Sequence, residues 1–347
     1  DARMIKNLGD AEAEAVVALQ RGIPLCDRPF AEIGRACGMS EEGVIALARR
    51  LLESGEARRF GAVFDARRMG YRSALCAMSV PPAQIAGVAA KVGEVPGVTH
   101  AYERGWPAEL AADLPGGPRG RVWPNLWFTL AAPAATFVAE LETLRAACQP
   151  LAIHEMPATR RFKIDVVFDV RTRDRDERVE PRPPVAEPPS PSPGWDGRAR
   201  EVVRLMQGDL PVDARLFATA ADRLGMGEAA LLDLLRSWRD AGVLRRVGLL
   251  LRHREIGFKA NGMCCWDMPA EAVTAAGRRV AAFPEVTHCY ERPWMEIFPF
   301  RLYAMIHTSE WEGTRLLFER ISREAGLSDG QLLLSLTEFK KTSMQFL

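Results

Sequence analysis

The chain opens with apolar residues at the spacing of amphipathic helices. This pattern predicts three short helices, over Ala11–Gln20, Phe30–Cys37 and Glu41–Ser54. Ser40 is a good N-cap for the third helix. A basic segment, Arg58–Phe64, follows and is expected to form a hairpin. Helix, turn, helix and basic hairpin in this order are typical of a winged helix-turn-helix module.

The same pattern returns near the middle of the chain. Helices are predicted over Arg198–Gln207, Leu216–Leu224 and Glu228–Ala241, and Arg245–Leu251 is the second basic segment. The sequence therefore predicts two helix-turn-helix modules.

Each module is followed by alternating or continuous apolar runs that predict strands, with helical segments between them. In the first half these are Ser73–Val80, Ala83–Val92, a hairpin between Val98 and Ala131 that includes Leu126–Ala131, Ala134–Ala147 and Phe162–Val170. In the second half they are Gly262–Trp266, Ala270–Ala281, Val286–Glu291, Arg301–Ile306, Trp311–Glu324 and a strand from Leu332 onward. The order βαββαβ predicts a ferredoxin-like domain in each half.

Two sequence motifs show that the halves are copies of one unit. RRFGAVFDARRMGY at 58–71 matches RRVGLLLRHREIGF at 245–258, with both arginines and two glycines at a constant separation of 187. VTHAYERGW at 98–106 matches VTHCYERPW at 286–294 at seven of nine positions. The gene is therefore interpreted as a fusion of two related units.

The segment between the units, residues 171–194, holds 7 of the 24 prolines and almost no apolar residues. Such a composition cannot bury enough surface to offset the entropy of ordering, so we expect an exposed linker. We expect the fold class α+β: the helix-turn-helix followed by βαββαβ in each unit resembles the Lrp/AsnC regulators, and this resemblance implies that the two units form an intrachain pseudo-dimer. The expected domains are residues 1–58 and 195–245 for the helix-turn-helix modules, and 59–170 and 246–347 for the ferredoxin-like domains.

Composition narrows the classes of function. Lys and Arg number 46 and Asp and Glu 45, so charge alone would not hold the chain on nucleic acid. The seven cysteines are an odd number and lack CxxC spacing, which predicts neither a disulfide framework nor a zinc ribbon. The longest uncharged run, 122–139, is interrupted by prolines, and no signal peptide is visible. These features favour the cytoplasm and no membrane segment.

The helix-turn-helix modules lack the side chains that read DNA. A recognition helix presents Arg, Lys, Asn or Gln near its N-terminus, whereas the first module has Glu41 and Glu42 there and the second has Glu228. Glutamates in this place would repel phosphates. We therefore expect modules that serve packing and dimerisation, and no nucleic-acid partner.

The T-H-x-Y-E-R motif carries the strongest chemical signal. In a strand its histidine, tyrosine and arginine point to one face, a grouping that a core seldom needs. Imidazole can bind iron or move protons, phenol can donate a proton, and guanidinium can hold a carboxylate. The motif predicts a site for an anionic ligand, with a structural hydrogen-bond network as the alternative. The residues are His100, Tyr102 and Arg104, and His288, Tyr290 and Arg292.

Other candidates are expected on the same sheet. Basic strand ends are predicted at Arg160, Arg161 and Lys163, aligned with Lys340, Lys341 and Ser343. An insertion that the second half lacks brings Arg119 and Arg121 on a glycine-rich loop, which could act as a lid. The aromatic side chains that could form flat walls are Trp106, Trp123, Trp127, Trp294 and Tyr303. His154 is a further candidate without a counterpart in the second half, so the halves are not equivalent.

RRFGAVFDARRMGY, THAYERGW, PNLWFTL and RRFKIDVVFD together resemble the siroheme decarboxylases, which are Lrp/AsnC-like proteins that act on tetrapyrroles. The resemblance covers nearly the whole chain and implies that a NirD-like and a NirL-like subunit are fused here. Pro293 replaces the glycine that follows the first motif, and Arg301–Leu302–Tyr303 replaces Asn-Leu-Trp. These departures predict unequal activity of the two halves.

The resemblance implies that two acetate side chains of siroheme lose their carboxyl groups, which gives didecarboxysiroheme on the pathway to d-type haem. It implies no cofactor beyond the iron of the substrate. His100 or His288 would bind that iron or donate a proton, Tyr102 or Tyr290 would donate or orient a proton, and Arg104 or Arg292 would anchor a carboxylate.

Two other functions fit the same architecture: a transcriptional regulator that binds a small effector, and a tetrapyrrole carrier or sensor without activity. The two halves are expected to pack on each other, and two chains could also form a homodimer.

Overall fold

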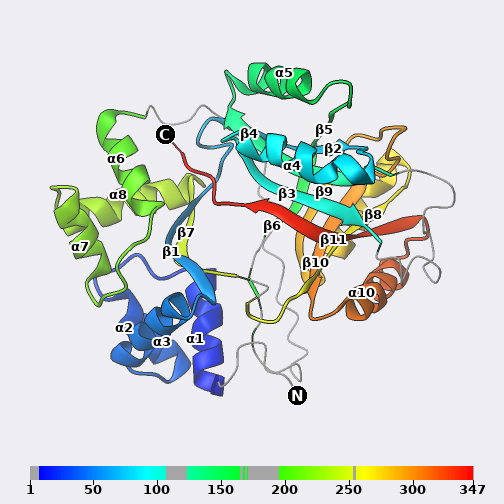
Figure 1. The fold of residues 1–347 in the computed structure, drawn as a ribbon. Helices are drawn as coiled ribbons and strands as arrows, with labels where there is room; N and C mark the ends of the chain where they lie inside the picture. Colours follow the sequence, from blue (N-terminus) through cyan, green and yellow to red (C-terminus); the bar gives the residue numbers. More distant parts are fainter. Residues whose placement is uncertain are drawn as a thin grey trace.

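The computed structural model describes residues 8–106, 123–164, 167–168, 170, 195–252 and 255–346. Two three-helix modules lie together on one side of the molecule, and a large sheet with its helices occupies the other side (Figure 1). The modules consist of α1 (Asp10–Arg21), α2 (Pro29–Cys37) and α3 (Glu41–Glu53), and of α6 (Gly197–Met206), α7 (Leu216–Arg223) and α8 (Glu228–Asp240). All six predicted helices are confirmed to within one residue at each end.

Local chemistry explains where these helices begin and turn. The Ser40 hydroxyl accepts a hydrogen bond from the Gly43 amide at 3.0 Å and caps α3. The Asp196 carboxylate accepts one from the Ala199 amide at 2.7 Å and caps α6. Gly38, at the end of α2, has φ +72°, a conformation that glycine adopts at little cost.

The basic segments pair with each other and do not form a hairpin within each unit. Strand β1 (Ala57–Phe64) runs antiparallel to β7 (Leu244–Leu251), with Gly61 opposite Gly248. A Cβ atom on Gly61 would lie 2.3 Å from the Gly208 carbonyl oxygen, so this close approach requires glycine. The glycine of the repeated segment therefore allows the backbones of the two units to approach closely at this point.

The ferredoxin-like units merge into one nine-stranded sheet with the order β5-β2-β4-β3-β11-β8-β10-β9-β6. Its strands are β2 (Tyr71–Met78), β3 (Val98–Gly105), β4 (Leu126–Pro133), β5 (His154–Pro157), β6 (Arg160–Ile164), β8 (Ala260–Trp266), β9 (Val286–Glu291), β10 (Leu302–Thr308) and β11 (Gly330–Lys341). The helices are α4 (Ile85–Glu94), α5 (Phe137–Cys148), α9 (Val273–Ala281) and α10 (Trp311–Glu324), with 3₁₀ turns η1 (Pro82–Gln84) and η3 (Ala270–Ala272). The predicted α+β architecture is confirmed.

The predicted strand Phe162–Val170 overlaps β6 only up to Ile164, and the described residues 167, 168 and 170 belong to no strand. The chain instead forms two short strands, β5 and β6, with residues 158 and 159 between them. Pro157 ends β5 because proline has no N–H to continue a ladder. β5 and β6 are the two ends of the strand order, so this short connection links the ends of the sheet.

The last strand of each unit pairs with the motif strand of the other unit. β6 of the first unit pairs with β9 of the second, and the end of β11 pairs with β3 of the first. In Figure 1, β3 and β11 run side by side through the middle of the sheet. Each motif strand is therefore flanked by one strand of its own unit and one of the other, which confirms the predicted pseudo-dimer.

Four clusters of buried apolar side chains hold this arrangement together. In each unit one cluster lies between the sheet and its helices, and a third cluster is shared by both helix-turn-helix modules. The fourth, which we call the inner core, joins β-strands of both units and contains Ala77, Trp127, Cys265, Tyr303 and Leu333.

The seven cysteines all belong to the described residues and are free thiols. No helix in this part of the chain is long and apolar enough to cross a membrane. The predicted linker 171–194 lies outside the described residues.

Candidate functional site

The two T-H-x-Y-E-R segments form β3 and β9, and their side chains alternate between two faces. Ala101 and Cys289 face the helices, where they belong to the helix-side cores of the two units. The histidine, tyrosine and arginine of each motif consequently lie on the opposite side, toward the inner core. The structure thus brings both triplets to one region between the units.

A neighbouring threonine orients each histidine ring. His100 Nδ1 lies 2.9 Å from Thr99 Oγ1, and His288 Nδ1 lies 3.0 Å from Thr287 Oγ1. Thr287 Oγ1 also lies 3.3 Å from the Met305 carbonyl oxygen, and when its hydroxyl donates there its oxygen accepts from His288. His288 then carries its proton on Nδ1, and the lone pair on Nε2 is available for a metal or a proton.

Both imidazoles are held neutral. Burial lowers the pKa of His100 to about 3, and the charges of Lys341, Arg58, His288 and Arg104 add to this effect. Burial likewise lowers the pKa of His288 to about 4, with Arg245, Arg292 and Lys163 contributing. A neutral imidazole is the form that binds iron or accepts a proton.

We expect the stability of the ligand-free protein to depend on these histidines. Between the ordinary histidine pKa of 6.5 and the folded value of about 3 or 4, the unfolded chain binds more protons. The contribution is therefore fully present above about pH 6.5 and falls as the pH drops, by about 1–2 kcal/mol per histidine at about pH 5.

Urea unfolding at about pH 7.5 and pH 5 measures this difference. The matched variant is the double substitution His100→Gln and His288→Gln, which should reduce the loss at low pH. An equal loss in the variant would show that other groups cause it.

The tyrosine rings lie between the histidines and the arginines. The His100 and Tyr102 ring centroids are 6.3 Å apart, and those of His288 and Tyr290 are 6.0 Å apart. The guanidinium of Arg104 lies 5.3 Å from the Tyr102 ring centroid, a cation–π contact. Burial raises the pKa of Tyr290, so its phenol keeps its proton.

Both motif arginines are buried, but they differ in their hydrogen bonds. Among the described residues Nε of each arginine has no hydrogen-bond partner, but Arg292 donates from Nη1 to the Met156 carbonyl oxygen whereas Nη1 of Arg104 also lacks a partner. Arg104 is 6 % exposed, and burial lowers its pKa to about 10. A buried cation without a counter-ion is costly, so this position suits an anionic ligand.

Sequence reasoning missed two members of the site. Arg58 and Arg245, the first arginines of the repeated RRxG segments, act electrostatically on the histidine and tyrosine of the two motifs. Their repetition at one constant separation was the available signal. The local sequence predicts only a basic hairpin, because the pairing of β1 with β7 cannot be seen locally.

Several predicted residues lie elsewhere. Arg161 pairs with Asp65 near the second motif, but Arg160 pairs with Glu291 and contacts Thr274. The Lys340 ammonium donates to the Gly93 carbonyl oxygen at the end of α4. Lys340 also donates to the Val95 carbonyl oxygen, and Lys163 donates to that of Phe283, the counterpart of Val95, so the register aligns Lys163 with Lys340, three residues away from the expected alignment.

Tyr303 does join the second triplet, because the Arg292 guanidinium lies 5.4 Å from its ring centroid, whereas the following candidates lie apart from both triplets. Trp106 packs against the helix-side core of the second unit, and Trp294 is 45 % exposed. His154 lines a shallow surface pocket with the residues at 295–297. Arg119 and Arg121 lie outside the described residues.

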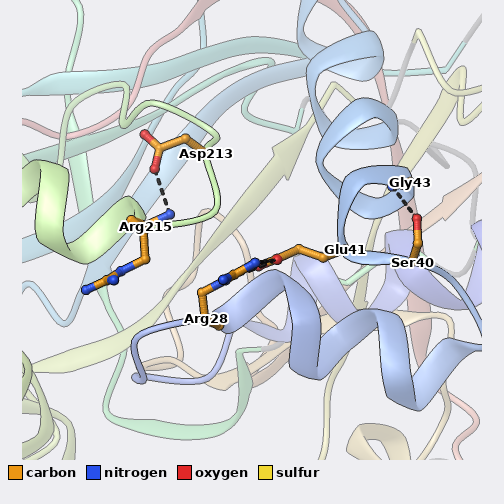
Figure 2. A network of polar contacts seen from close by, with 6 residues as sticks. All are labelled: Arg28, Ser40, Glu41, Gly43, Asp213 and Arg215. Carbon is orange, nitrogen blue, oxygen red and sulfur yellow. Dashed lines mark hydrogen bonds and ion pairs between the residues drawn. The ribbon is translucent and has the colours of Figure 1, made fainter.

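The acidic starts of the presumed recognition helices are engaged within the modules. Arg28 Nε donates to Glu41 at 3.0 Å, as Figure 2 shows together with the Ser40 cap. Arg215 pairs with Glu228 at the equivalent place in the second module. These ion pairs hold the glutamates where a DNA reader would need a cation or an amide.

The arginines of the same helices bind the opposite module. Arg49 of α3 donates to the Val212 carbonyl oxygen at 2.9 Å, and Arg236 of α8 donates to the Leu25 carbonyl oxygen at 2.8 Å. The two bonds are reciprocal because these positions match in the repeat. They fasten the modules to each other.

Tandem helix-turn-helix modules with exchanged ferredoxin-like strands place the chain in the Lrp/AsnC class. Family models agree: an AsnC-like ligand binding domain matches residues 68–163 and 255–340, and a siroheme decarboxylase NirDL-like helix-turn-helix domain matches residues 12–58 and 199–245.

Relatives narrow the class to one family. A siroheme decarboxylase of Hydrogenobacter thermophilus is 34% identical over 98% of this chain and 96% of its own length. A siroheme decarboxylase NirDL subunit of Paracoccus denitrificans is 31% identical over 90% and 89%. The crystal structure of the siroheme decarboxylase NirDL matches with a TM-score of 0.67 at 30% identity, covering 96% of this chain and 94% of that one.

The same enzyme in complex with an iron-uroporphyrin III analogue matches with a TM-score of 0.64 at 29% identity, over 96% of this chain and 94% of that one. The chain belongs to the siroheme decarboxylase family and is a carboxy-lyase.

Proposed function

We propose that this chain removes the carboxyl groups of two acetate side chains of siroheme and gives didecarboxysiroheme, a precursor of d-type haem. The observation that carries the proposal is the pair of histidine–tyrosine–arginine triplets facing the inner core, with Arg104 buried and lacking a counter-ion among the described residues. A substrate that carries several carboxylates around an iron macrocycle matches this chemistry.

The reaction balances without an oxidant or a reductant. In each step the bond between the acetate methylene and its carboxyl carbon breaks, carbon dioxide leaves, and the electron pair enters the macrocycle. A proton added to the methylene carbon then gives a methyl group. We propose no cofactor beyond the siroheme iron, which is part of the substrate.

The roles of the residues follow from their protonation. The neutral imidazole of His100 or His288 can bind the siroheme iron through Nε2, and the other can hold the proton that the methylene carbon receives. The carboxylates of bound siroheme would offset the nearby cations and raise the histidine pKa toward the range of a proton donor. Tyr290, protonated at neutral pH, is the alternative donor, and Arg104 anchors a carboxylate.

Anaerobic incubation with siroheme, followed by mass spectrometry, tests the function. The tetrapyrrole should lose the mass of two carbon dioxide molecules, and the double substitution His100→Ala and His288→Ala should abolish the loss. Unchanged siroheme with a bound-iron spectrum would instead identify a carrier or sensor.

We further propose that the helix-turn-helix modules hold the two halves together in a cytoplasmic protein and read no DNA. The ion pairs at Glu41 and Glu228 and the reciprocal bonds of Arg49 and Arg236 support this proposal.

We expect no discrete complex with duplex DNA in gel-shift experiments, because the first turns of α3 and α8 carry glutamates and no cation of their own. Fragments from upstream of the gene, tested at low and moderate salt, are the appropriate probes. The matched variant Glu41→Gln with Glu228→Gln removes the repelling charges and should bind DNA more readily. A specific complex of the unmodified protein would favour the regulator.

A further inference from the structure

The two halves of the site are built from matching positions of the repeat but differ in charge. Arg58 and Arg245 correspond at the separation of 187, and both are arginines. The same separation relates Asp65, directly after β1, to Arg252, directly after β7. An acidic position in one half is therefore basic in the other.

In the half that contains His288, Asp65 neutralises two arginines. Its carboxylate lies 3.2 Å from Arg161 Nη1 and 3.6 Å from Arg245 Nε. Burial opposes the ionisation of Asp65, but the charges of Arg161 and Arg245 outweigh it and lower its pKa. A ligand carboxylate that approached this half would meet arginines whose charge is already matched, and it would be repelled by Asp65.

In the half that contains His100, Arg58 has no such partner. Its Nε is buried without a hydrogen bond, and no carboxylate among the described residues pairs with it. Burial lowers the pKa of Arg58, and the like charge of Arg252 lowers it further. Glu338 supplies a carboxylate in this half, at the register position opposite Tyr102 that Arg161 takes opposite Tyr290, and Lys341 adds a positive charge beside His100.

The motif arginines show the same difference independently. Arg292, in the second half, donates from Nη1 to the Met156 carbonyl oxygen, and its Nε lacks a partner among the described residues. Arg104, in the first half, has two guanidinium nitrogens without partners in the described part of the chain, although it is more than nine-tenths buried. Both arginines of the His100 half therefore have unsatisfied guanidinium groups.

We propose that the His100 half, with Arg58 and Arg104, binds the carboxylates of the tetrapyrrole. Asp65 excludes these carboxylates from the His288 half, because it neutralises the arginines there and repels negative charge. This inference rests on the proposed function and specifies which half of the site takes the anionic groups.

Matched substitutions test it, with iron uroporphyrin III as the probe and its dissociation constant as the measurement. Arg58→Gln should raise the dissociation constant about 10–100-fold, since a charge-assisted hydrogen bond is lost. The factor by which Arg245→Gln raises the dissociation constant should be at least ten times smaller, because Asp65 already neutralises that arginine. Thermal unfolding of both variants shows whether they remain folded.

A third variant leaves both arginines in place. Arg252→Asp puts a carboxylate where Asp65 stands in the other half, and it should weaken binding as Arg58→Gln does. Equal losses in Arg58→Gln and Arg245→Gln, or unchanged binding in folded Arg252→Asp, would overturn the inference. If the unmodified protein decarboxylates siroheme in that case, the proposed function stands; if it neither binds nor converts siroheme, the proposed function fails as well.

Discussion

Replacing His100 with alanine is expected to slow siroheme decarboxylation by ~100–10,000-fold, the usual contribution of a proton donor or acceptor. His288→Ala should also slow the reaction, by a smaller factor. The difference follows from the charges around each ring, because the arginine beside His288 is paired with Asp65 whereas the arginine beside His100 is not.

Single-turnover assays under anaerobic conditions measure this effect, with each variant first checked for folding and for binding of iron uroporphyrin III. Free imidazole should partly restore His100→Ala, because the substitution leaves a space the size of the ring. If both single variants decarboxylate siroheme at the rate of the unmodified protein, the motif has no role in catalysis.

The second large effect concerns Arg104. Replacing it with methionine keeps most of the volume but removes a buried, unpaired charge, so the ligand-free protein should gain about 1–4 kcal/mol in free energy of unfolding. Tetrapyrrole binding should weaken by about 30–1,000-fold, because a ligand carboxylate loses its buried partner. A residue that stabilised the fold alone would not show these opposite changes.

Arg292→Met is the matched control. Arg292 donates to the Met156 carbonyl oxygen, so the substitution removes this hydrogen bond and should stabilise the protein less or destabilise it. Denaturant unfolding and titration with iron uroporphyrin III measure both quantities. Reduced stability of Arg104→Met together with unchanged binding would contradict the assignment of Arg104 as a carboxylate anchor.

The parts of the fold that depend on local chemistry could be predicted from the sequence. Ser40 caps α3 through a bond to a residue three positions away, and a helical stripe is visible within one segment. Alternation along β3 and β9 placed each histidine, tyrosine and arginine on one face without knowledge of the neighbouring strands.

Pairings between distant segments could not be predicted in this way. No local pattern shows that β1 pairs with β7, or that β6 crosses to β9. Local sequence consequently places Arg58 in a hairpin, whereas the structure places it beside the first motif. The predicted alignment of Lys163 with Ser343 is wrong because the pairing of β6 with β9 and of β11 with β3, which puts Lys163 and Lys340 at equivalent positions, cannot be seen locally.

A crystal structure with didecarboxysiroheme bound tests the central claim most directly. The account predicts a macrocycle against the inner faces of β3 and β9, its iron within bonding distance of Nε2 of His100 or His288, and a carboxylate on Arg104. A product bound away from both triplets, with no motif side chain in contact with it, would contradict the account.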